Sequence, residues 1–193
     1  MSTQMEKESM QSKKPMVLVL AGPNGSGKST ITTYFDKVGK YTNADDVVAT
    51  TGMDNREAAM LVDRMRYASI EKKEDFTFET VLSSDYKIEI LRRAKSEGYF
   101  IKCIFVLTND PQINVARIDM RVASGGHFVE TEKVIERYYK SINNIKRLIE
   151  ICDIMHVYDN TKRPTRIIRK HKEALSIYPN EYWNEETLLK LIL

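Results

Sequence analysis

The sequence has few of the features that mark membrane, secreted or metal-binding proteins. Only two of its 193 residues are cysteines, Cys103 and Cys152, too far apart to resemble a zinc site or a C-x-x-C redox pair. Each lies in an apolar stretch, so we expect two buried free thiols. No apolar run reaches the ~20 residues that a membrane-spanning helix needs. These absences argue against a disulfide scaffold and a membrane protein, and they favour the reducing cytoplasm.

An excess of charge is also absent. The chain carries 30 basic and 27 acidic residues, which leaves a formal net charge of +3. It has no continuous tract that is both basic and rich in aromatic residues, so nucleic acid is the less expected partner. A near-neutral protein can still bind small anionic substrates at one local site.

The chain length fits one domain, residues 15–193, preceded by a leader at 1–14 that is polar and expected to be mobile. Apolar strands and amphipathic helices alternate along the domain. We expect strands at 15–21, 41–44, 76–79, 99–107, 154–158 and 166–170. We expect helices at 28–38, 55–73, 85–96 and 111–122, and a terminal helix that begins at Asn184. A further long helix is expected to have on its core face Ile135, Tyr138, Ile142, Ile145 and Ile149. This alternation predicts an α/β fold, a mostly parallel sheet with helices on both faces.

A glycine-rich loop follows the first strand. Residues 22–29, GPNGSGKS, match the G-x-x-x-x-G-K-[ST] phosphate-loop (Walker A) motif in full. The motif follows a buried strand and opens a helix, so its backbone N–H groups can surround phosphate oxygens. We expect Lys28 to reach the β- and γ-phosphates of ATP and Ser29 to bind Mg²⁺. The nucleotide-binding set is Gly22, Pro23, Asn24, Gly25, Ser26, Gly27, Lys28, Ser29 and Thr30.

Other nucleotide-binding classes lack their signatures here. A GTPase carries N-K-x-D to recognise guanine, and the similar stretch at 108–110 has no lysine. The LSGGQ-like signature of transporter ATPases is also missing. The chain is too short for the added modules of most helicases and motor ATPases. A small kinase is therefore the favoured class.

Acidic residues follow two of the expected strands, where ligands gather in open parallel sheets. Asp45 and Asp46 come after the second strand, and Glu79 ends the third. A kinase needs a carboxylate to orient the acceptor hydroxyl and take its proton. Asp45 is a candidate for this base, and Asp46 could instead cap the segment that follows. Glu79 is expected to hold a substrate hydroxyl or a metal-bound water.

Arginines gather around a second glycine loop. Arg117 and Arg121 are four residues apart on one expected helix, and Arg137 lies on the next, beyond Gly125 and Gly126. Two such helices resemble a lid, around 111–140, that closes over polyphosphate and excludes water. His127 has no second histidine or cysteine at ligand spacing, so we expect it to form loop hydrogen bonds and not to bind a metal.

These motifs in order resemble the zeta toxin family of P-loop kinases. The resemblance covers roughly residues 16–160 and rests on GPNGSGKST, TNADDVVA, FTFETVLSS and the stretch NVARIDMRVASGGHFV with its following VIERYYKS. It implies a P-loop three-layer fold and a transferase that uses ATP and Mg²⁺. It also implies phosphorylation of a sugar hydroxyl of UDP-N-acetylglucosamine, and a small antitoxin protein as partner.

The resemblance also assigns roles to residues. It favours Asp45 over Asp46 as the base, places Glu79 and Thr80 against the substrate, and brings Arg137 to the ATP phosphates. Where the family has another lid arginine, this sequence has Gly126 and His127. Arg117 or Arg121 is expected to take over its work, and we assign Arg121 to the phosphates and Arg117 to the substrate.

Two alternatives remain open at the level of sequence. One is a nucleotide-dependent switch that acts through a protein partner. The other is a kinase of polynucleotide 5′-hydroxyl groups, which would use the same chemistry on a different acceptor.

Overall fold

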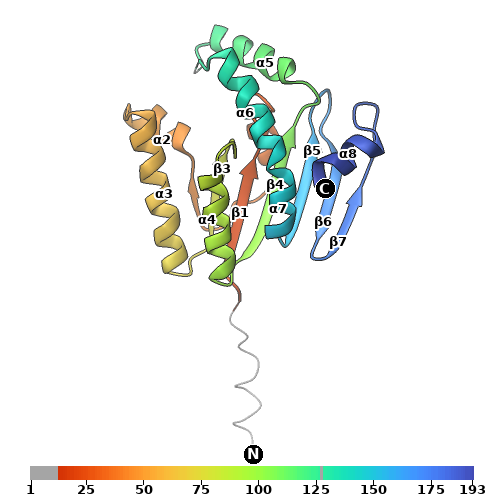
Figure 1. Cartoon of the computed structure of the whole chain (residues 1–193). Coiled ribbons are helices and arrows are strands. Elements are labelled where there is room, and N and C mark those ends of the chain that lie inside the picture. The colour runs from red at the N-terminus through yellow and green to blue at the C-terminus, as the bar shows by residue number, and fades with distance from the viewer. Residues whose placement is uncertain (1–12, 127) are drawn as a thin grey trace, which may run out of the picture.

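The computed structural model describes residues 13–126 and 128–193, so His127 and residues 1–12 of the expected leader lie outside the described residues. Seven strands form one sheet in the order β2-β3-β1-β4-β5-β6-β7 (Figure 1). The strands are β1 (Met16–Ala21), β2 (Lys40–Thr42), β3 (Phe76–Thr80), β4 (Phe100–Leu107), β5 (Ile154–Asp159), β6 (Thr165–His171) and β7 (Ala174–Ile177). β1 to β5 are parallel, and β6 and β7 are antiparallel, so the predicted mostly parallel α/β sheet is confirmed.

Eight helices accompany this sheet within the described residues. They are α1 (Lys28–Thr32), α2 (Ala44–Thr51), α3 (Asn55–Glu71), α4 (Asp85–Ser96), α5 (Pro111–Ala123), α6 (Thr131–Asn143), α7 (Ile145–Ile151) and α8 (Glu185–Ile192). Figure 1 shows α3, α4, α7 and α8 in front of the sheet, while α5 and α6 project beyond the carboxyl ends of the strands.

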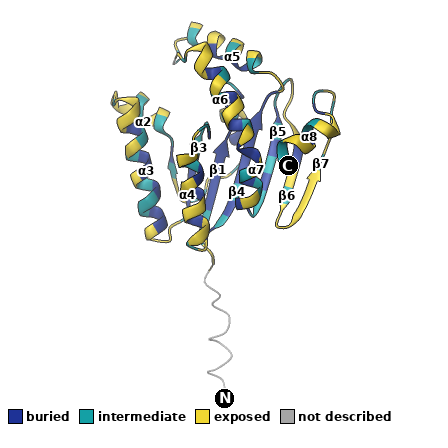
Figure 2. Cartoon of the chain, in the orientation of Figure 1, coloured by how far each residue is buried: buried dark blue, intermediate teal, exposed yellow. Residues whose placement is uncertain are grey.

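The two faces of the sheet are covered unequally. On one face, alternate strand residues such as Val17, Val19 and Phe105 join a large core with residues of α4, α7 and α8. On the other face, Leu18 and Leu20 belong to a small cluster that is closed by Ile31 of α1 and by Phe35. Figure 2 shows the central strands as the most buried part of the chain and β7 as exposed. Helices lie on both faces as predicted, but the second face has little cover.

The helix after the phosphate loop is shorter than predicted. α1 ends at Thr32 and does not continue to Val38. The backbone of Val38 instead bonds in both directions with the Thr77 hydroxyl of β3, at 2.8 and 2.7 Å. This pairing requires the chain to cross to the sheet edge before residue 38. Long-range pairing, which periodicity does not reveal, therefore ends the helix.

The predicted long helix is in fact two helices, α6 and α7, which meet at Asn144. The Asn144 amide donates to the carbonyl of Leu82 at 2.9 Å and accepts from Arg147. Asn144 is 7% exposed, so this contact with the β3–α4 loop is part of the core. The buried seam also differs from the predicted one: Tyr138 and Ile145 are buried as expected, but Ile135, Ile142 and Ile149 are only half-buried.

Two further differences lie at the sheet edges. β2 ends at Thr42, and Asn43 caps α2, so Asp45 and Asp46 lie in the first turn of a helix and not at the end of a strand. At the opposite edge, the sequence predicted one strand after β5, whereas β6 and β7 form a hairpin. β7 has only four residues, almost all of them exposed, so no buried apolar stretch marks it as a strand in the sequence.

Both cysteines are buried and free, as predicted. Burial raises the pKa of the Cys103 thiol, and the adjacent Cys152 raises it further. The sheet therefore brings together two thiols that are distant in the sequence.

Candidate active site at the carboxyl ends of the strands

The phosphate loop connects β1 to α1 and depends on glycine at three positions. Gly22, Gly25 and Gly27 have φ values of +139°, +74° and +85°, in a region that other residues rarely adopt. A Cβ atom on Gly22 would lie 2.0 Å from the carbonyl oxygen of Val106, and one on Gly25 would lie 2.4 Å from that of Asn114. The loop therefore has both the backbone conformation and the close packing that the motif predicts.

Two asparagines from distant elements hold this loop in place. The amide of Asn114, on α5, donates to the carbonyl of Asn24 at 2.6 Å. The amide of Asn160, directly after β5, donates to the carbonyl of Ser26 at 2.8 Å. Within the loop, the N–H of Ser26 bonds to the carbonyl of Pro23 at 3.3 Å, so an anion would be bound by other N–H groups of the loop.

The loop residues fit a nucleotide phosphate and Mg²⁺. The Ser26 hydroxyl and the Asn24 side-chain oxygen are buried, and neither has a hydrogen-bond partner among the described residues. Buried polar atoms without partners are costly, and a ligand with its water shell could satisfy them. Ser29 and Thr30 are exposed at the start of α1, so the Ser29 hydroxyl is free to reach a metal ion.

Lys28 lies at the centre of the site. Its ammonium group donates to the carbonyl of Pro23 at 3.0 Å. Burial lowers the pKa of Lys28, while Glu79 and Asp45 act in the opposite direction by attracting its charge. The charges of both carboxylates that the sequence analysis chose therefore act on the lysine of the loop.

Asp45 and Asp46 are adjacent, but their surroundings differ. One oxygen of Asp46 accepts a hydrogen bond from the Asn43 amide at 3.1 Å. The carboxylate of Asp45 has no hydrogen-bond partner among the described residues, and only its backbone N–H is bonded, to Asn43. Of the two, Asp45 is the one whose charge acts on Lys28. Asp46 thus supports the start of α2, while Asp45 is left for a ligand.

Glu79 is half-buried at the end of β3. Burial raises the pKa of its carboxyl, and the nearby Lys28 charge partly opposes that rise. The hydroxyl of Tyr41 donates to Glu79 at 3.3 Å. Thr80, the next residue, is half-buried, and its hydroxyl accepts a bond from the N–H of Leu82 at 3.0 Å. These contacts fix the chain on the side of the site opposite the phosphate loop.

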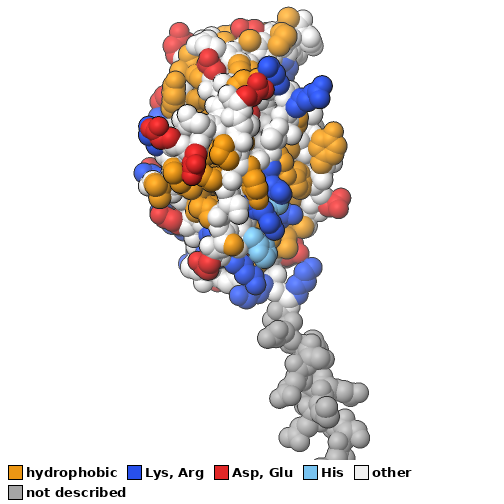
Figure 3. All heavy atoms as spheres, turned by 90° about the vertical axis from the view of Figure 1, so that its right-hand side faces the viewer, with side chains coloured by type: hydrophobic (Ala, Val, Ile, Leu, Met, Phe, Trp, Pro, Cys, Tyr) orange, Lys and Arg blue, Asp and Glu red, His pale blue; other side chains and the backbone are white. Residues whose placement is uncertain are grey.

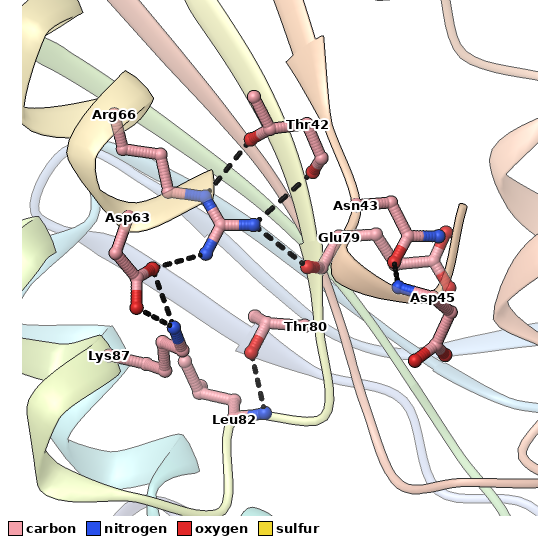
Figure 4. A network of polar contacts seen from close by, with 9 residues as sticks. All are labelled: Thr42, Asn43, Asp45, Asp63, Arg66, Glu79, Thr80, Leu82 and Lys87. Carbon is pink, nitrogen blue, oxygen red and sulfur yellow. Dashed lines mark hydrogen bonds and ion pairs between the residues drawn. The ribbon is translucent and has the colours of Figure 1, made fainter. Parts of the chain in front are cut away.

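A buried arginine, Arg66, stabilises the side of the site formed by the ends of β2 and β3 (Figure 4). Arg66 of α3 is 2% exposed and donates to the hydroxyl of Thr42 at 3.0 Å and to its carbonyl at 3.2 Å. It also reaches the carbonyl of Glu79, at 3.5 Å. Its charge is balanced by Asp63 at 2.8 Å, which pairs in turn with Lys87 at 2.6 Å. One guanidinium therefore joins the ends of β2 and β3.

The three predicted arginines lie in different settings. Arg117 donates to the carbonyls of Asn160 and Thr161 at 2.8 and 3.0 Å, and its other terminal nitrogen is buried without a partner among the described residues. Arg121 lies near enough for its charge to lower the pKa of Lys28. Arg137 is half-buried on α6, close to Tyr138, whose hydroxyl donates to the carbonyl of Thr108 at 2.6 Å. Arg117 thus lies beside Asn160, which bonds the phosphate loop, and the charge of Arg121 acts on Lys28. The contacts of these arginines and of Arg137 with phosphate or substrate stay predictions.

Sequence reasoning missed three residues that organise the site: Asn114, Asn160 and Arg66. Arg66 had a detectable signal, because it falls on the same helical stripe as Val62 and Ile70, where a charge is out of place. Asn160 follows directly after a strand, a position that the sequence analysis used for Asp45 and Glu79 but not here. Asn114 had no comparable signal.

The described residues hold no group of three or more His, Cys, Asp or Glu side chains able to bind a metal ion. A Mg²⁺ ion carried mainly by phosphates and water needs no such group. In the same residues no helix is long and apolar enough to cross a membrane.

Comparisons with known proteins agree with this geometry. A family model described as Zeta toxin matches residues 43–174. An uncharacterized protein of Haemophilus influenzae is 33% identical over 124 residues, which is 61% of this chain and 88% of that protein.

Solved structures share the fold at low identity. A chain of the AvrRxo1-ORF1:AvrRxo1-ORF2 complex with sulphate ions superposes with a TM-score of 0.70 at 15% identity over 97% of this chain, and this chain spans 66% of its length. The same complex was also solved with ATP. A chain of the PezAT toxin-antitoxin system of Streptococcus pneumoniae gives 0.56 at 18% identity, over 80% of this chain and 71% of that one.

Proposed function

The chain belongs to the zeta toxin family. On that premise we propose that it is a kinase that transfers the γ-phosphoryl group of ATP to a hydroxyl of UDP-N-acetylglucosamine or a related small phosphorylated metabolite. One observation carries the proposal. The charges of Asp45 and Glu79 both act on Lys28, so a phosphate-binding lysine and two acceptor-side carboxylates meet at one edge of the sheet.

On the donor side, the loop residues Gly22 to Thr30 bind the ATP phosphates through backbone N–H groups, and Lys28 contacts the β- and γ-phosphates. Ser29 is the residue that would hold Mg²⁺, which supplies positive charge that neutralises the phosphates when it is bound. The buried hydroxyl of Ser26, which lacks a partner among the described residues, supports this role for the loop.

On the acceptor side, Asp45 is the base. The acceptor oxygen forms a bond to the γ-phosphorus, the bond from that phosphorus to the bridging β-γ oxygen breaks, and the hydroxyl proton passes to the Asp45 carboxylate. The products are ADP and a phosphomonoester. Glu79 and Thr80 hold the acceptor, and the buried nitrogen of Arg117 that has no partner among the described residues suits an anionic part of it.

Arg121 and Arg137 stabilise the charge that develops during transfer, and α5 and α6 act as the lid that excludes water. Arg121 supports this role through its effect on Lys28. A small antitoxin is the proposed protein partner, by analogy with the toxin-antitoxin system of the PezAT relative.

The direct test incubates the protein with Mg-ATP and candidate acceptors and measures a product one phosphoryl group heavier. We expect Asp45→Asn to abolish transfer and to leave ATP binding intact, while the matched control Asp46→Asn keeps most of the activity. Lys28→Ala should lose both transfer and binding. Equal transfer by Asp45→Asn and wild type would reject Asp45 as the base.

The identity of the phosphoryl acceptor is tested in a separate experiment. Supplying a 5′-hydroxyl oligonucleotide in place of the nucleotide sugar examines the polynucleotide kinase alternative. If ATP binds but neither acceptor is phosphorylated, the kinase proposal fails and the switch alternative gains support.

A further inference from the structure

One part of the sheet is left uncovered on the side that carries α1. The small cluster beneath α1 ends at Val106 and Tyr158, and no helix of the described residues belongs to it beyond α1. Past this cluster lie the outer strands β5, β6 and β7, of which β7 forms the sheet edge. We call this region the open face and define it by Lys102, His156, Arg166, Arg169 and His171.

The register of the strands places these five side chains on one surface. Ile104 of the small cluster lies opposite His156, and His156 lies opposite Arg169. Lys102 and His171 share the face because each is two residues from one of these positions, and side chains alternate along a strand. Arg166 lies opposite Tyr158, which also packs against the small cluster.

An irregularity in the sheet keeps both arginines on this side. The pairing of β5 with β6 shifts between Val157 and Tyr158, so that Ile167 and Ile168 are adjacent and both fully buried. A bulge of this kind re-aims the side chains around it. Without it, strict alternation would place Arg166 and Arg169 on opposite faces.

The charges of the open face are not neutralised within the described residues. None of Lys102, Arg166, Arg169 and His171 forms an ion pair there, and Arg166 contacts the ring of Tyr178 instead, at 5.6 Å. Burial and, after it, the charges of Arg166, Lys102, Arg169 and His171 together lower the pKa of His156 to about 4. These groups therefore lie close enough together to create a local positive field. Figure 3 shows Lys, Arg and His side chains gathered on the side of the molecule that faces away from α3.

The open face also contains a notch of about 210 Å³, lined by Arg169, His171, Ala174 and Ser176. Small side chains on β7 lie opposite large ones on β6, Ser176 opposite Arg169 and Ala174 opposite His171. The notch thus offers a guanidinium, an imidazole and a hydroxyl at one hollow. This donor set matches the oxygens of a phosphate group.

Aromatic rings lie among the cations. Lys102 is 5.7 Å from the ring of Phe35, and Tyr158 packs edge-on against Phe35 and His156. Tyr178, beside Arg166, is 39% exposed. Cations mixed with aromatic rings on a flat sheet characterise surfaces that bind single-stranded nucleic acid, where rings stack on bases and cations contact phosphates.

We propose that the open face binds the phosphodiester backbone of a single-stranded nucleic acid, with one phosphate in the notch and others at Lys102 and Arg166. An acidic protein segment would satisfy the charges but would have no use for the aromatic rings. The surface is built from four strands, β4 to β7, which explains why no basic, aromatic-rich tract exists in the sequence. It does not depend on the identity of the kinase acceptor.

The test measures binding of labelled single-stranded RNA and DNA oligonucleotides by fluorescence anisotropy over a range of KCl concentrations. We expect the triple variant Lys102→Ala/Arg166→Ala/Arg169→Ala to bind on the order of 10- to 100-fold more weakly. The slope of log affinity against log salt should become shallower by about 2, at roughly 0.7 for each lost phosphate contact. A control variant, Arg64→Ala/Lys72→Ala/Lys146→Ala, removes the same charge from exposed sites on α3, its carboxyl end and α7, and should bind like wild type.

Two further variants separate this binding from folding and from catalysis. Arg166→Lys/Arg169→Lys keeps the charge and should retain most of the affinity even if the alanine variant is unstable. Lys28→Ala should bind oligonucleotides like wild type, because no residue of the phosphate loop belongs to the open face. Loss of oligonucleotide binding in Lys28→Ala, or equal loss in the control triple variant, would overturn the proposal. Binding of polyglutamate without binding of oligonucleotides would also overturn it and assign the open face to an acidic protein.

Discussion

The donor half and the acceptor half of the candidate site are stabilised by different means. The phosphate loop is held by close packing, because glycines approach carbonyl oxygens of β4 and α5 and two asparagine amides bond its own carbonyls. The ends of β2 and β3 are held by one buried charge, Arg66, with its partners Thr42 and Asp63. Adding a methyl group to a loop glycine should therefore disrupt the donor half. Removing the charge of Arg66 should disrupt the acceptor half.

The largest expected effect comes from adding a methyl group to the loop. In Gly25→Ala the new Cβ would meet the carbonyl oxygen of Asn114 at 2.4 Å, at a φ of +74°. Both the clash and the strained backbone oppose the loop conformation, so ATP affinity should fall by at least about 100-fold. Isothermal titration with ATP measures it. The control Gly52→Ala has a similar φ of +68° but nothing within 4 Å, and it should bind ATP like wild type.

Removing the buried charge should chiefly affect folding. Arg66→Met leaves Asp63 with Lys87 alone and frees the polar groups of Thr42, so we expect the free energy of unfolding to fall by about 3 kcal/mol. Urea denaturation measures it. Arg64→Met, an exposed position on the same helix, should change stability by less than about 0.5 kcal/mol. If the two variants prove equally stable, Arg66 does not brace the acceptor half.

A smaller effect is expected from one amide bond to the loop. Asn160→Ala removes the 2.8 Å bond to the Ser26 carbonyl, worth about 1 kcal/mol. ATP affinity should weaken roughly 5-fold. KM for the acceptor should stay constant, because the side-chain amide of Asn160 bonds only the phosphate loop and the backbone carbonyl that accepts from Arg117 is unchanged. Asn55→Ala, exposed on α3, is the control. A raised acceptor KM with unchanged ATP affinity would contradict the separation of the two halves.

The smallest effect concerns the pH dependence of stability. Burial raises the pKa of Glu79 above the ordinary 4.5, so the folded protein favours the neutral carboxyl more than the unfolded chain does. Ionised Glu79 therefore costs stability above its folded pKa, and the cost disappears as pH falls to 4.5. Glu79→Gln should melt a few degrees higher than wild type at neutral pH, and the difference should shrink toward pH 4.5.

The control for this measurement is Glu71→Gln, which changes the same charge at an exposed position of α3. A melting difference between Glu79→Gln and wild type that stays constant with pH would show that the carboxyl of Glu79 is not destabilised by burial.

Local patterns predicted most elements of the fold. The limits of α4 were predicted to the residue, and those of β1, β3, β4 and α5 within one. The errors occur where a contact with a distant residue sets the end of a helix. Val38 bonds to Thr77 of β3 and so lies outside α1, and Asn144 bonds to Leu82 where the predicted long helix is interrupted. β7 was missed because it is a four-residue edge strand that is exposed at most positions, so it has no buried apolar stretch.

The candidate site divides in the same way. The glycines, Lys28 and Ser29 follow one another in the chain, so the motif specifies them together. Asp45 and Glu79 could be chosen because Asp45 closely follows β2 and Glu79 lies at the end of β3. The contacts of Arg66, Asn114 and Asn160 join segments 24, 90 and 134 residues apart, and no single segment indicates those pairings.

The sequence by itself determined that this chain forms a phosphate loop between a buried strand and a helix, because the motif needs only neighbouring residues and their allowed backbone angles. The tertiary structure decided which of Asp45 and Asp46 is left for a ligand and which charge stabilises the acceptor half. It also decided that cations from β4 and β6 share one surface. These outcomes depend on strand register and on burial. Both arise when distant segments pack together, and neither is specified within a single segment.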